Sequence, residues 1–174
     1  ESVDGRTSGV GWVGNSNCRM RDLKGINTEI NPAKDQLIGE GYNVELVTSD
    51  GNDRMIPHER MPGYYNQIDL YVCQSLCEGT PNPVLEAMAC GVPVISTDVG
   101  LIPEAFGPKQ MQYVLRERSA KCLADAIRRL MEHPEDFAAL SEENLKQIQQ
   151  GAWPLMTQNF KRDFESCLAQ KEEP

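Results

Sequence analysis

The stretch from Ser75 to Gly100 constrains the fold most, because its residues predict a loop, a short helix, a tight stop and a buried strand. Asn82 is expected to cap the helix with its side-chain oxygen. Pro83 suits the first helical position, where its missing N–H would have no partner anyway. One apolar face follows at helical spacing, formed by Val84, Leu85, Met88 and Ala89.

The end of this helix and the strand behind it are marked as clearly. Gly91 fits the left-handed conformation just past a helix, and Pro93 prevents the helix from continuing. Val94 and Ile95 then form a short β-branched run, which is typical of a strand covered on both faces. The pattern therefore predicts a strand inside a parallel sheet.

Two carboxylates flank the start of this helix, Glu78 in the loop and Glu86 just after the first turn. Loop and helix N–H groups form a positive end that suits an anionic ligand. A carboxylate beside that end can accept hydrogen bonds from sugar hydroxyls while the N–H groups hold phosphate. Spacing alone favours the alternative, in which Glu78 is a solvated loop charge and Glu86 is a favourable first-turn acid.

The residue identities add a family resemblance. Glu78, seven further residues and Glu86, followed by Ala-Met-Ala-Cys-Gly-Val-Pro-Val-Ile-Ser-Thr, resemble the Glu-x7-Glu motif of retaining GT-B glycosyltransferases of the glycogen-synthase-like, group 1 type. The resemblance implies that Glu86 binds the ribose hydroxyls of a nucleotide. It also implies that the donor sugar is held by Glu78, Gly79, Thr80, Pro81 and Asn82.

A second candidate segment follows the first predicted strand. Gly14 closes that strand, and a basic loop with Arg19, Arg21 and Lys24 leads towards a helix, as at many phosphate sites. An ordinary surface loop with three solvated cations is the alternative. The segment also resembles the family's first phosphate loop, which implies nucleotide contacts for Gly14, Lys24 and one of the two arginines. Asn15 stands where the family usually has arginine.

The rest of the chain alternates predicted strands and helices. Further strands are expected at residues 10–13, 42–48, 54–56, 69–73 and 112–115. Further helices are expected at 26–37, interrupted or restarted at Pro32, between the Ser119 cap and His133, at 135–150, and after Pro154. This order predicts an α/β fold, a Rossmann-like parallel sheet with helices on both faces, one half of a GT-B fold, plus C-terminal helices. Ligands bind such sheets beyond the C-terminal strand ends.

Length and composition bound the class. With 174 residues the chain is expected to be one domain at residues 9–174, preceded by a polar linker at 1–8. It begins at Glu1 without an initiator Met, so we expect a piece of a longer protein. The net charge of −9 argues against nucleic acid as the main partner. No apolar run approaches the ~18 residues of a transmembrane segment, so we expect a soluble globular protein.

The cysteines raise the question of a metal site. Cys73, Cys77 and Cys90 could converge near the loop at residues 78–82, which the resemblance assigns to the donor sugar. The chain has no Cys-x-x-Cys pair, however, and no His beside these cysteines. Cysteine is often a small buried apolar residue. We therefore predict no metal site, and reduced thiols in a cytoplasmic protein.

The resemblance implies transfer of a hexose from a nucleotide-diphosphate sugar, with no other cofactor. Glu78 and Lys24 are the expected catalytic residues, with Lys24 stabilising the departing diphosphate. The expected partners are the nucleotide sugar and an N-terminal acceptor-binding domain of the same protein, so this chain alone is expected to bind without transfer. A nucleotide-sugar epimerase or hydrolase half-domain and a non-catalytic nucleotide-sugar-binding module remain the alternatives.

Two further features bear on that interpretation. Leu101 stands where the family usually has a second glycine, and its side chain is expected to narrow the space beside the phosphates.

Three aromatic residues, Trp153, Phe160 and Phe164, make the last helix more aromatic than a free surface helix needs. They either cover this domain's own core or, by the resemblance, pack towards the N-terminal domain.

Overall fold

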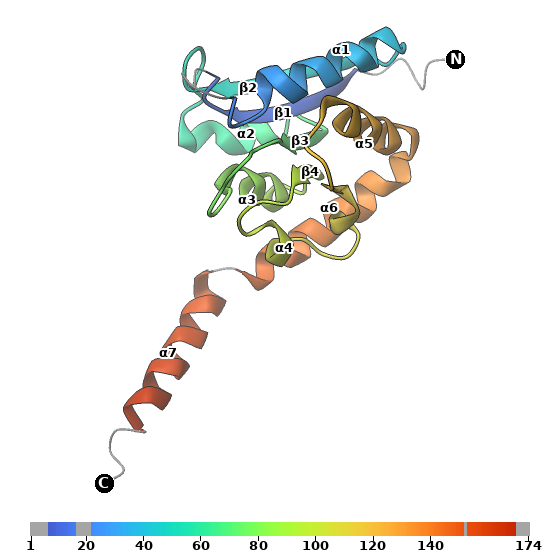
Figure 1. The fold of residues 1–174 in the computed structure, drawn as a ribbon. Helices are drawn as coiled ribbons and strands as arrows, with labels where there is room; N and C mark the ends of the chain where they lie inside the picture. Colours follow the sequence, from blue (N-terminus) through green and yellow to red (C-terminus); the bar gives the residue numbers. More distant parts are fainter. Residues whose placement is uncertain (1–6, 17–21, 152, 170–174) are drawn as a thin grey trace.

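The computed structural model describes residues 7–16, 22–151 and 153–169, which form a five-stranded sheet. The strand order is β2-β1-β3-β4-β5, and every neighbouring pair is parallel (Figure 1). The strands are β1 (Ser8–Gly14), β2 (Val44–Asp50), β3 (Leu70–Cys73), β4 (Val94–Thr97) and β5 (Val114–Leu115). The chain order reverses at β1, which has β2 on one side and β3 on the other. In open α/β sheets such a reversal opens a crevice beyond the carboxyl ends of the strands.

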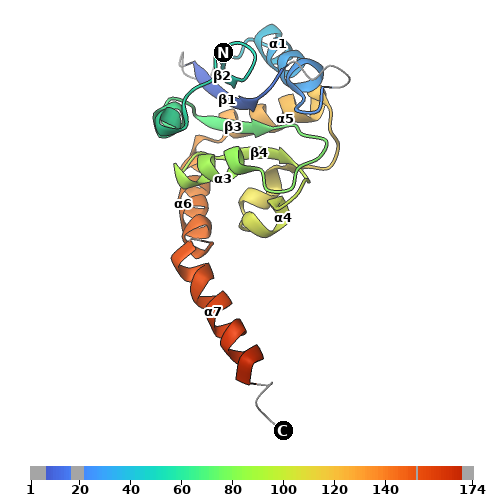
Figure 2. The same cartoon turned by 90° about the vertical axis from the view of Figure 1, so that its left-hand side faces the viewer.

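Helices cover both faces of this sheet (Figures 1 and 2). One face packs against the π-helical turn η1 (Ile26–Ile30), α1 (Asn31–Gly39) and α5 (Ala120–Glu132). The other face packs against α2 (Met61–Tyr65), α3 (Asn82–Ala89) and α4 (Ile102–Ala105). The long helix α6 (Pro134–Gln150) contributes to both cores, and the 3₁₀ turns η2 (His58–Arg60) and η3 (Gln110–Tyr113) join elements. The predicted Rossmann-like α/β fold is confirmed.

The predicted helix stops and starts are confirmed where their signals are local. Gly91 has a φ of 72°, and Val92 N donates to Ala87 O at 2.9 Å, which closes the left-handed end of α3. All four residues of β4 are buried. Ser119 caps α5 by accepting a hydrogen bond from Cys122 N at 3.2 Å. Pro32 lies in the first turn of α1, which follows η1 without a break, because Ile30 and Asn31 both have right-handed helical dihedrals.

The prediction for the start of α3 was wrong in detail. Pro81 is the N-cap residue, and no side chain caps the helix. Asn82 already lies inside the helix, and its backbone N–H donates to Thr80 O at 2.9 Å. The buried face contains Ala87, whereas Ala89 is exposed. The face is rotated because α3 packs against α6 as well as against the sheet.

Two predicted strands also differ from the structure. Residues 54–56 form no strand, because Ile56 N donates to Ser49 Oγ at 3.0 Å rather than to a neighbouring backbone. The edge strand β5 begins only at Val114. Ahead of it the side chain of Gln110 takes the place of a strand, since its Oε1 accepts from Val94 N at 3.2 Å and its Nε2 donates to Val94 O.

The chain ends lie outside this core. β1 starts at Ser8, the last residue of the predicted linker, and residues 1–6 lie outside the described residues. At the other end α7 (Trp153–Ala169) extends away from the sheet (Figures 1 and 2). Phe160 and Phe164 on α7 are 56% and 68% exposed. Among the described helices, none has the length and apolar character needed to cross a membrane.

Candidate functional site

The carboxyl ends of β1, β3 and β4 bring the sequence-predicted residues to one edge of the sheet. Gly14 ends β1, the loop with Glu78 follows β3, and the turn with Gly100 follows β4. At Gly14 a Cβ would lie 2.5 Å from a ring carbon of Trp12. Glycine at this position therefore leaves room for the buried Trp12 indole. This packing requirement is independent of any contact between the Gly14 backbone and a ligand.

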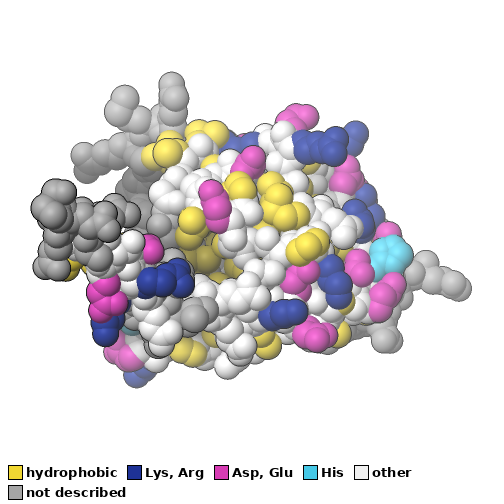
Figure 3. All heavy atoms as spheres, turned by 90° about the horizontal axis from the view of Figure 1, so that it is seen from below, with side chains coloured by type: hydrophobic (Ala, Val, Ile, Leu, Met, Phe, Trp, Pro, Cys, Tyr) yellow, Lys and Arg dark blue, Asp and Glu magenta, His cyan; other side chains and the backbone are white. Residues whose placement is uncertain are grey.

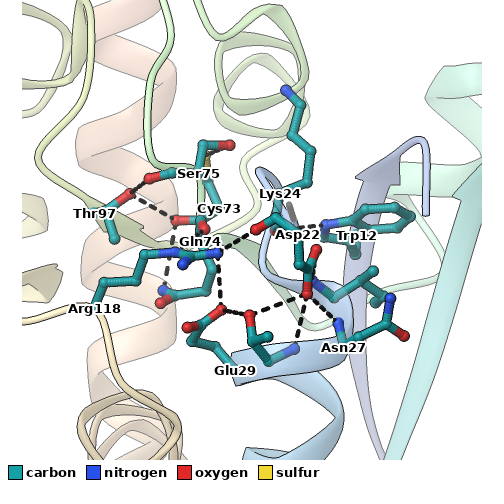
Figure 4. Close-up of polar contacts among 12 residues, drawn as sticks. Trp12, Asp22, Lys24, Asn27, Glu29, Cys73, Gln74, Ser75, Thr97 and Arg118 are labelled. Atoms are coloured by element: carbon teal, nitrogen blue, oxygen red, sulfur yellow. Dashed lines mark hydrogen bonds and ion pairs between the residues drawn. The ribbon is translucent and has the colours of Figure 1, made fainter. Parts of the chain in front are cut away.

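Lys24 and Glu78 form the polar centre of this edge. Lys24 Nζ is ion-paired with Glu78 Oε1, and Ser75 Oγ donates to the same oxygen at 2.7 Å. The Lys24 side chain is 35% exposed and that of Glu78 only 15%, so the pair is less screened than a surface pair. Thr97 Oγ1 donates to Ser75 O at 2.7 Å, which joins β4 to the same cluster (Figure 4).

Backbone-directed bonds hold the Lys24 segment against the loop after β3. Trp12 Nε1 donates to Lys24 O at 3.3 Å (Figure 4). Leu76 N donates to Leu23 O at 2.9 Å. The position of the Lys24 ammonium therefore depends on both β1 and the loop after β3.

The loop that carries Glu78 also rests on the turn after β4. Gly100 has a φ of +54°, and a Cβ there would lie 2.1 Å from Gly79 O. Leu101 N donates to the same carbonyl at 3.0 Å. The Leu101 backbone therefore supports the loop that carries Glu78, and the Leu101 side chain is 40% exposed.

Glu86 is held by a tyrosine from the neighbouring helix. Tyr65 Oη donates to Glu86 Oε2 at 2.8 Å. Burial of the Tyr65 ring, together with its hydrogen bond to the Glu86 carboxylate, raises the pKa of Tyr65 far above its ordinary value. The hydroxyl therefore stays protonated and fixes one carboxylate oxygen of Glu86, which leaves its other oxygen for a further donor.

The two helix starts at this edge differ. At η1 the Asp22 carboxylate accepts from the backbone N–H groups of Ile26, Asn27 and Thr28 at 3.1, 2.6 and 2.8 Å. The N–H groups at the start of the helix behind the basic loop are therefore hydrogen-bonded within the chain itself. At α3 no side chain occupies the equivalent place. Pro81 and Pro83 have no N–H, and the N–H groups of Asn82, Val84 and Leu85 donate to Thr80 O and Pro81 O. The start of α3 therefore offers an anion the positive end of the helix dipole rather than free N–H groups.

A small hollow of about 10 Å³, enough for one water molecule, lies between β1, β3 and the start of α3. Lys24, Ser75, Glu78, Pro81 and Pro83 line it on the loop side. Pro81 is buried, whereas the neighbouring predicted donor-sugar residues Gly79, Thr80 and Asn82 are exposed. The loop thus exposes Gly79, Thr80 and Asn82 to solvent, while Pro81 packs into the protein beneath them.

Two of the predicted site residues lie outside the described part of the chain, and one residue at the site was not predicted from the sequence. Arg19 and Arg21 lie outside the described residues. Arg118 was missed, although it donates to the backbone of both loops that meet here. It lies just before α5, far along the chain from its partners, so no local sequence signal marks it.

The described cysteines are free thiols, with Cys73 buried and Cys77 exposed, and Cys18 lies outside the described residues. Within the described part of the chain no group of three or more His, Cys, Asp or Glu residues is arranged to hold a metal ion.

A separate, largely apolar groove of about 450 Å³ lies between α3, α4 and the C-terminal end of α6, lined by Leu85, Leu101, Ala105 and Ile148 among others. Figure 3 shows hydrophobic side chains gathered around a hollow on the face of the molecule seen from below. This groove is distinct from the polar Lys24–Glu78 edge.

Solved structures share this fold. The C-terminal domain of a group 1 glycosyl transferase from Francisella tularensis matches with a TM-score of 0.64 and 21% identity, covering 82% of this chain and 85% of that one. Anabaena HepE, solved in complex with UDP, matches with a TM-score of 0.65 and 16% identity, covering 92% of this chain and 49% of that one. The fold is therefore that of the C-terminal domain of a GT-B glycosyltransferase.

Sequence comparison then assigns the family. The profile of "Glycosyl transferases group 1" matches residues 54–147, more than half of the chain, so the chain belongs to this family. A Bacillus subtilis glycosyltransferase assigned to teichuronic acid biosynthesis is 39% identical over 98 residues, which cover 56% of this chain and 23% of the relative. Across six curated relatives the matched part is between 21% and 42% of the relative's length.

The contact between Gly100 and Gly79 predicts a sharp difference between two glycines of the site. Gly100→Ala should lower the free energy of unfolding by at least ~2 kcal/mol, because it adds both a left-handed alanine and a clash with Gly79 O. Gly79→Ala is the matched control, since its Cβ would meet no atom within 4 Å, and it should change stability by less than ~0.5 kcal/mol. Urea unfolding that shows equal costs would contradict the described packing.

Proposed function

We propose that this chain is the donor-binding domain of a retaining glycosyltransferase, which transfers a hexose from a nucleotide-diphosphate sugar to an acceptor. The observation that carries the proposal is the meeting of Lys24 and Glu78 at the reversal of strand order, where α/β sheets bind ligands. Membership of the group 1 family supports it. So does the likeness in fold to HepE, which was solved with UDP.

Each part of the donor has a proposed contact. Lys24, together with the start of α3 and one of Arg19 and Arg21, binds the diphosphate, and Glu86 accepts hydrogen bonds from the ribose hydroxyls. The sugar lies against the donor loop, with contacts to Glu78, Gly79, Thr80, Pro81 and Asn82. The Gly14 backbone borders the phosphates.

The Lys24–Glu78 pair has a specific consequence for binding. In the ligand-free chain Glu78 neutralises the Lys24 ammonium, which suits a domain with a net charge of −9. A diphosphate brings two or more negative charges and competes with Glu78 for Lys24. When Lys24 turns to the phosphates, Glu78 is released to accept hydrogen bonds from sugar hydroxyls. In the bound state Lys24 therefore contacts the diphosphate and Glu78 contacts the sugar.

The chemistry follows from this placement. During transfer the bond between the anomeric carbon and the diphosphate oxygen breaks, and a bond to an acceptor oxygen forms. Negative charge grows on the departing diphosphate, where Lys24 and the positive end of the α3 dipole stabilise it. We expect no cofactor besides the donor, and we expect catalysis to depend on holding donor and acceptor in one closed cleft. The free thiols agree with a cytoplasmic location, which we also propose.

Nucleotide release by the full-length protein tests the reaction class. A transferase should release nucleotide from the matching nucleotide sugar only when an acceptor is present. Release without acceptor, or conversion to an epimeric sugar, would favour the epimerase or hydrolase alternative. Binding without any turnover by the full-length protein would indicate a nucleotide-sugar sensor.

Substitutions of Lys24 and Glu78 should affect ligands in opposite ways. Lys24→Ala should weaken binding of a nucleoside diphosphate by about tenfold or more but leave the nucleoside almost unchanged, because only the former carries the charge. Glu78→Gln should bind the nucleoside diphosphate at least as tightly as the wild type, since Lys24 loses a competitor, and should bind the nucleotide sugar more weakly. Calorimetric titration measures all four affinities. A uniform loss for every ligand in Lys24→Ala would mean that Lys24 is structural.

Glu86 should be specific for ribose hydroxyls. Glu86→Ala should lose ~1.5–3 kcal/mol of nucleotide binding, the value of a hydrogen bond to a charged group. Tyr65→Phe, which removes the bond that holds Glu86 in place, should lose less. The control ligand is the 2′,3′-dideoxynucleotide, for which Glu86→Ala should make no difference. Equal nucleotide affinity in wild type and Glu86→Ala would remove the assignment.

The proposed partner domain should cover α7. Phe160 and Phe164 are exposed, and the side chain of Trp153 lies outside the described ones, so the two described aromatic side chains of α7 do not cover this domain's core. In the full-length protein we expect Phe164→Ser to reduce transfer to the acceptor while nucleotide binding stays unchanged. Gln158→Ser, on the same helix and also exposed, is the control. Unchanged transfer by Phe164→Ser would argue that α7 has no partner domain.

A further inference from the structure

Arg118 joins the two loops that carry Lys24 and Glu78. Its Nε donates to Gln74 O at 2.7 Å and its Nη2 donates to Asp22 O at 2.6 Å (Figure 4). Gln74 immediately precedes Ser75, which binds Glu78, and Asp22 lies two residues before Lys24. One side chain from the segment before α5 is therefore bonded to the backbone just ahead of both halves of the candidate site.

The guanidinium is also neutralised where it lies. Arg118 Nη2 is 2.9 Å from Glu29 Oε2, and the side chains of Arg118 and Glu29 are only 18% and 10% exposed. The planar fork of arginine reaches three acceptors from fixed directions, whereas a lysine ammonium is a point charge on a flexible stem. Lysine would preserve the positive charge but not this geometry.

The two loops leave little freedom where Arg118 holds them. Gly25 has a φ of +72°, and a Cβ there would lie 2.5 Å from Gln74 Cβ and 2.7 Å from Gln74 O. The backbones are thus in direct contact beside Arg118. A small displacement at this point moves the Lys24 and Glu78 side chains relative to each other.

We propose that Arg118 is a positioning residue that sets the spacing between Lys24 and Glu78 through Gln74 and Asp22. The effect on binding rests on the proposed donor-binding function, because the spacing between Lys24 and Glu78 is then the one that matches the diphosphate and the sugar. That Arg118 holds the two loops together does not depend on which ligand binds. Arg118 itself does not contact the donor in this proposal.

Amide hydrogen exchange tests the structural content without ligand. The reporter is Leu76 N–H, which bridges the loops by donating to Leu23 O. In Arg118→Lys its exchange should be at least about tenfold faster, the factor expected when a local opening loses a charged hydrogen bond. Tyr71 N–H, bonded to Pro93 O inside the sheet, should keep its rate within about twofold. The control variant is Arg128→Lys, a surface arginine on α5 paired with Glu40 and Asp125.

Titration tests the consequence for binding. Uridine, guanosine and adenosine diphosphates and their nucleosides are titrated into the wild type and both variants. For the base that binds, Arg118→Lys should weaken the diphosphate about tenfold and the nucleoside less than twofold. An equal loss for both ligands would mean that Arg118 only stabilises the fold, which would overturn the positioning role.

The outcomes separate the two proposals. If Arg118→Lys does not fold, Glu29→Gln replaces it, because removing the charge opposite Arg118 should speed Leu76 exchange in the same direction by a smaller factor. An unchanged Leu76 rate in a folded variant overturns the Arg118 proposal even if nucleotides bind. Absence of binding by the wild type to all three diphosphates contradicts the donor-binding function, whereas the exchange result still decides the role of Arg118.

Discussion

The backbone of Gly25 lies directly against Gln74, and the arrangement of the candidate site depends on that approach. It is the point where the segment after β1 meets the segment after β3, at the reversal of strand order. Because side chains cannot fit between the two segments, Lys24 and Glu78 are brought close enough to form an ion pair. Arg118 and the Leu76–Leu23 hydrogen bond hold the same approach from either side.

Electrostatics relates the contact between these two segments to the binding of an anionic ligand. The chain carries a net charge of −9, so a diphosphate is attracted only by features that concentrate positive charge locally. The start of η1 is not such a feature, because the Asp22 carboxylate already accepts from its N–H groups. The Lys24 ammonium supplies positive charge instead, together with the positive end of the α3 dipole. The Glu78 carboxylate holds Lys24 in place in the ligand-free chain, and we propose that an anionic ligand competes for it.

Sequence reasoning succeeded where the deciding interactions are local. The Gly91 stop and the Ser119 cap were predicted because each depends on residues within one turn. It failed for Asn82, because Pro81 takes the cap position one residue earlier. Residues 112–113 were predicted as strand because their pattern does not show that the Gln110 side chain already pairs with β4. Arg118 could not be found, since its acceptors lie 44 and 96 positions away. The parallel sheet predicted that the site lies beyond the carboxyl ends of the strands, but the ion pair between Lys24 and Glu78 was not predicted.

A crystal structure of the protein with its nucleotide sugar would show the donor contacts themselves. We expect the diphosphate within hydrogen-bond distance of Lys24 Nζ, the ribose hydroxyls donating to Glu86, and Glu78 separated from Lys24 and bound to the sugar. Placement of the nucleotide anywhere other than the carboxyl ends of β1, β3 and β4, or an intact Lys24–Glu78 pair beside a bound diphosphate, would contradict the proposal.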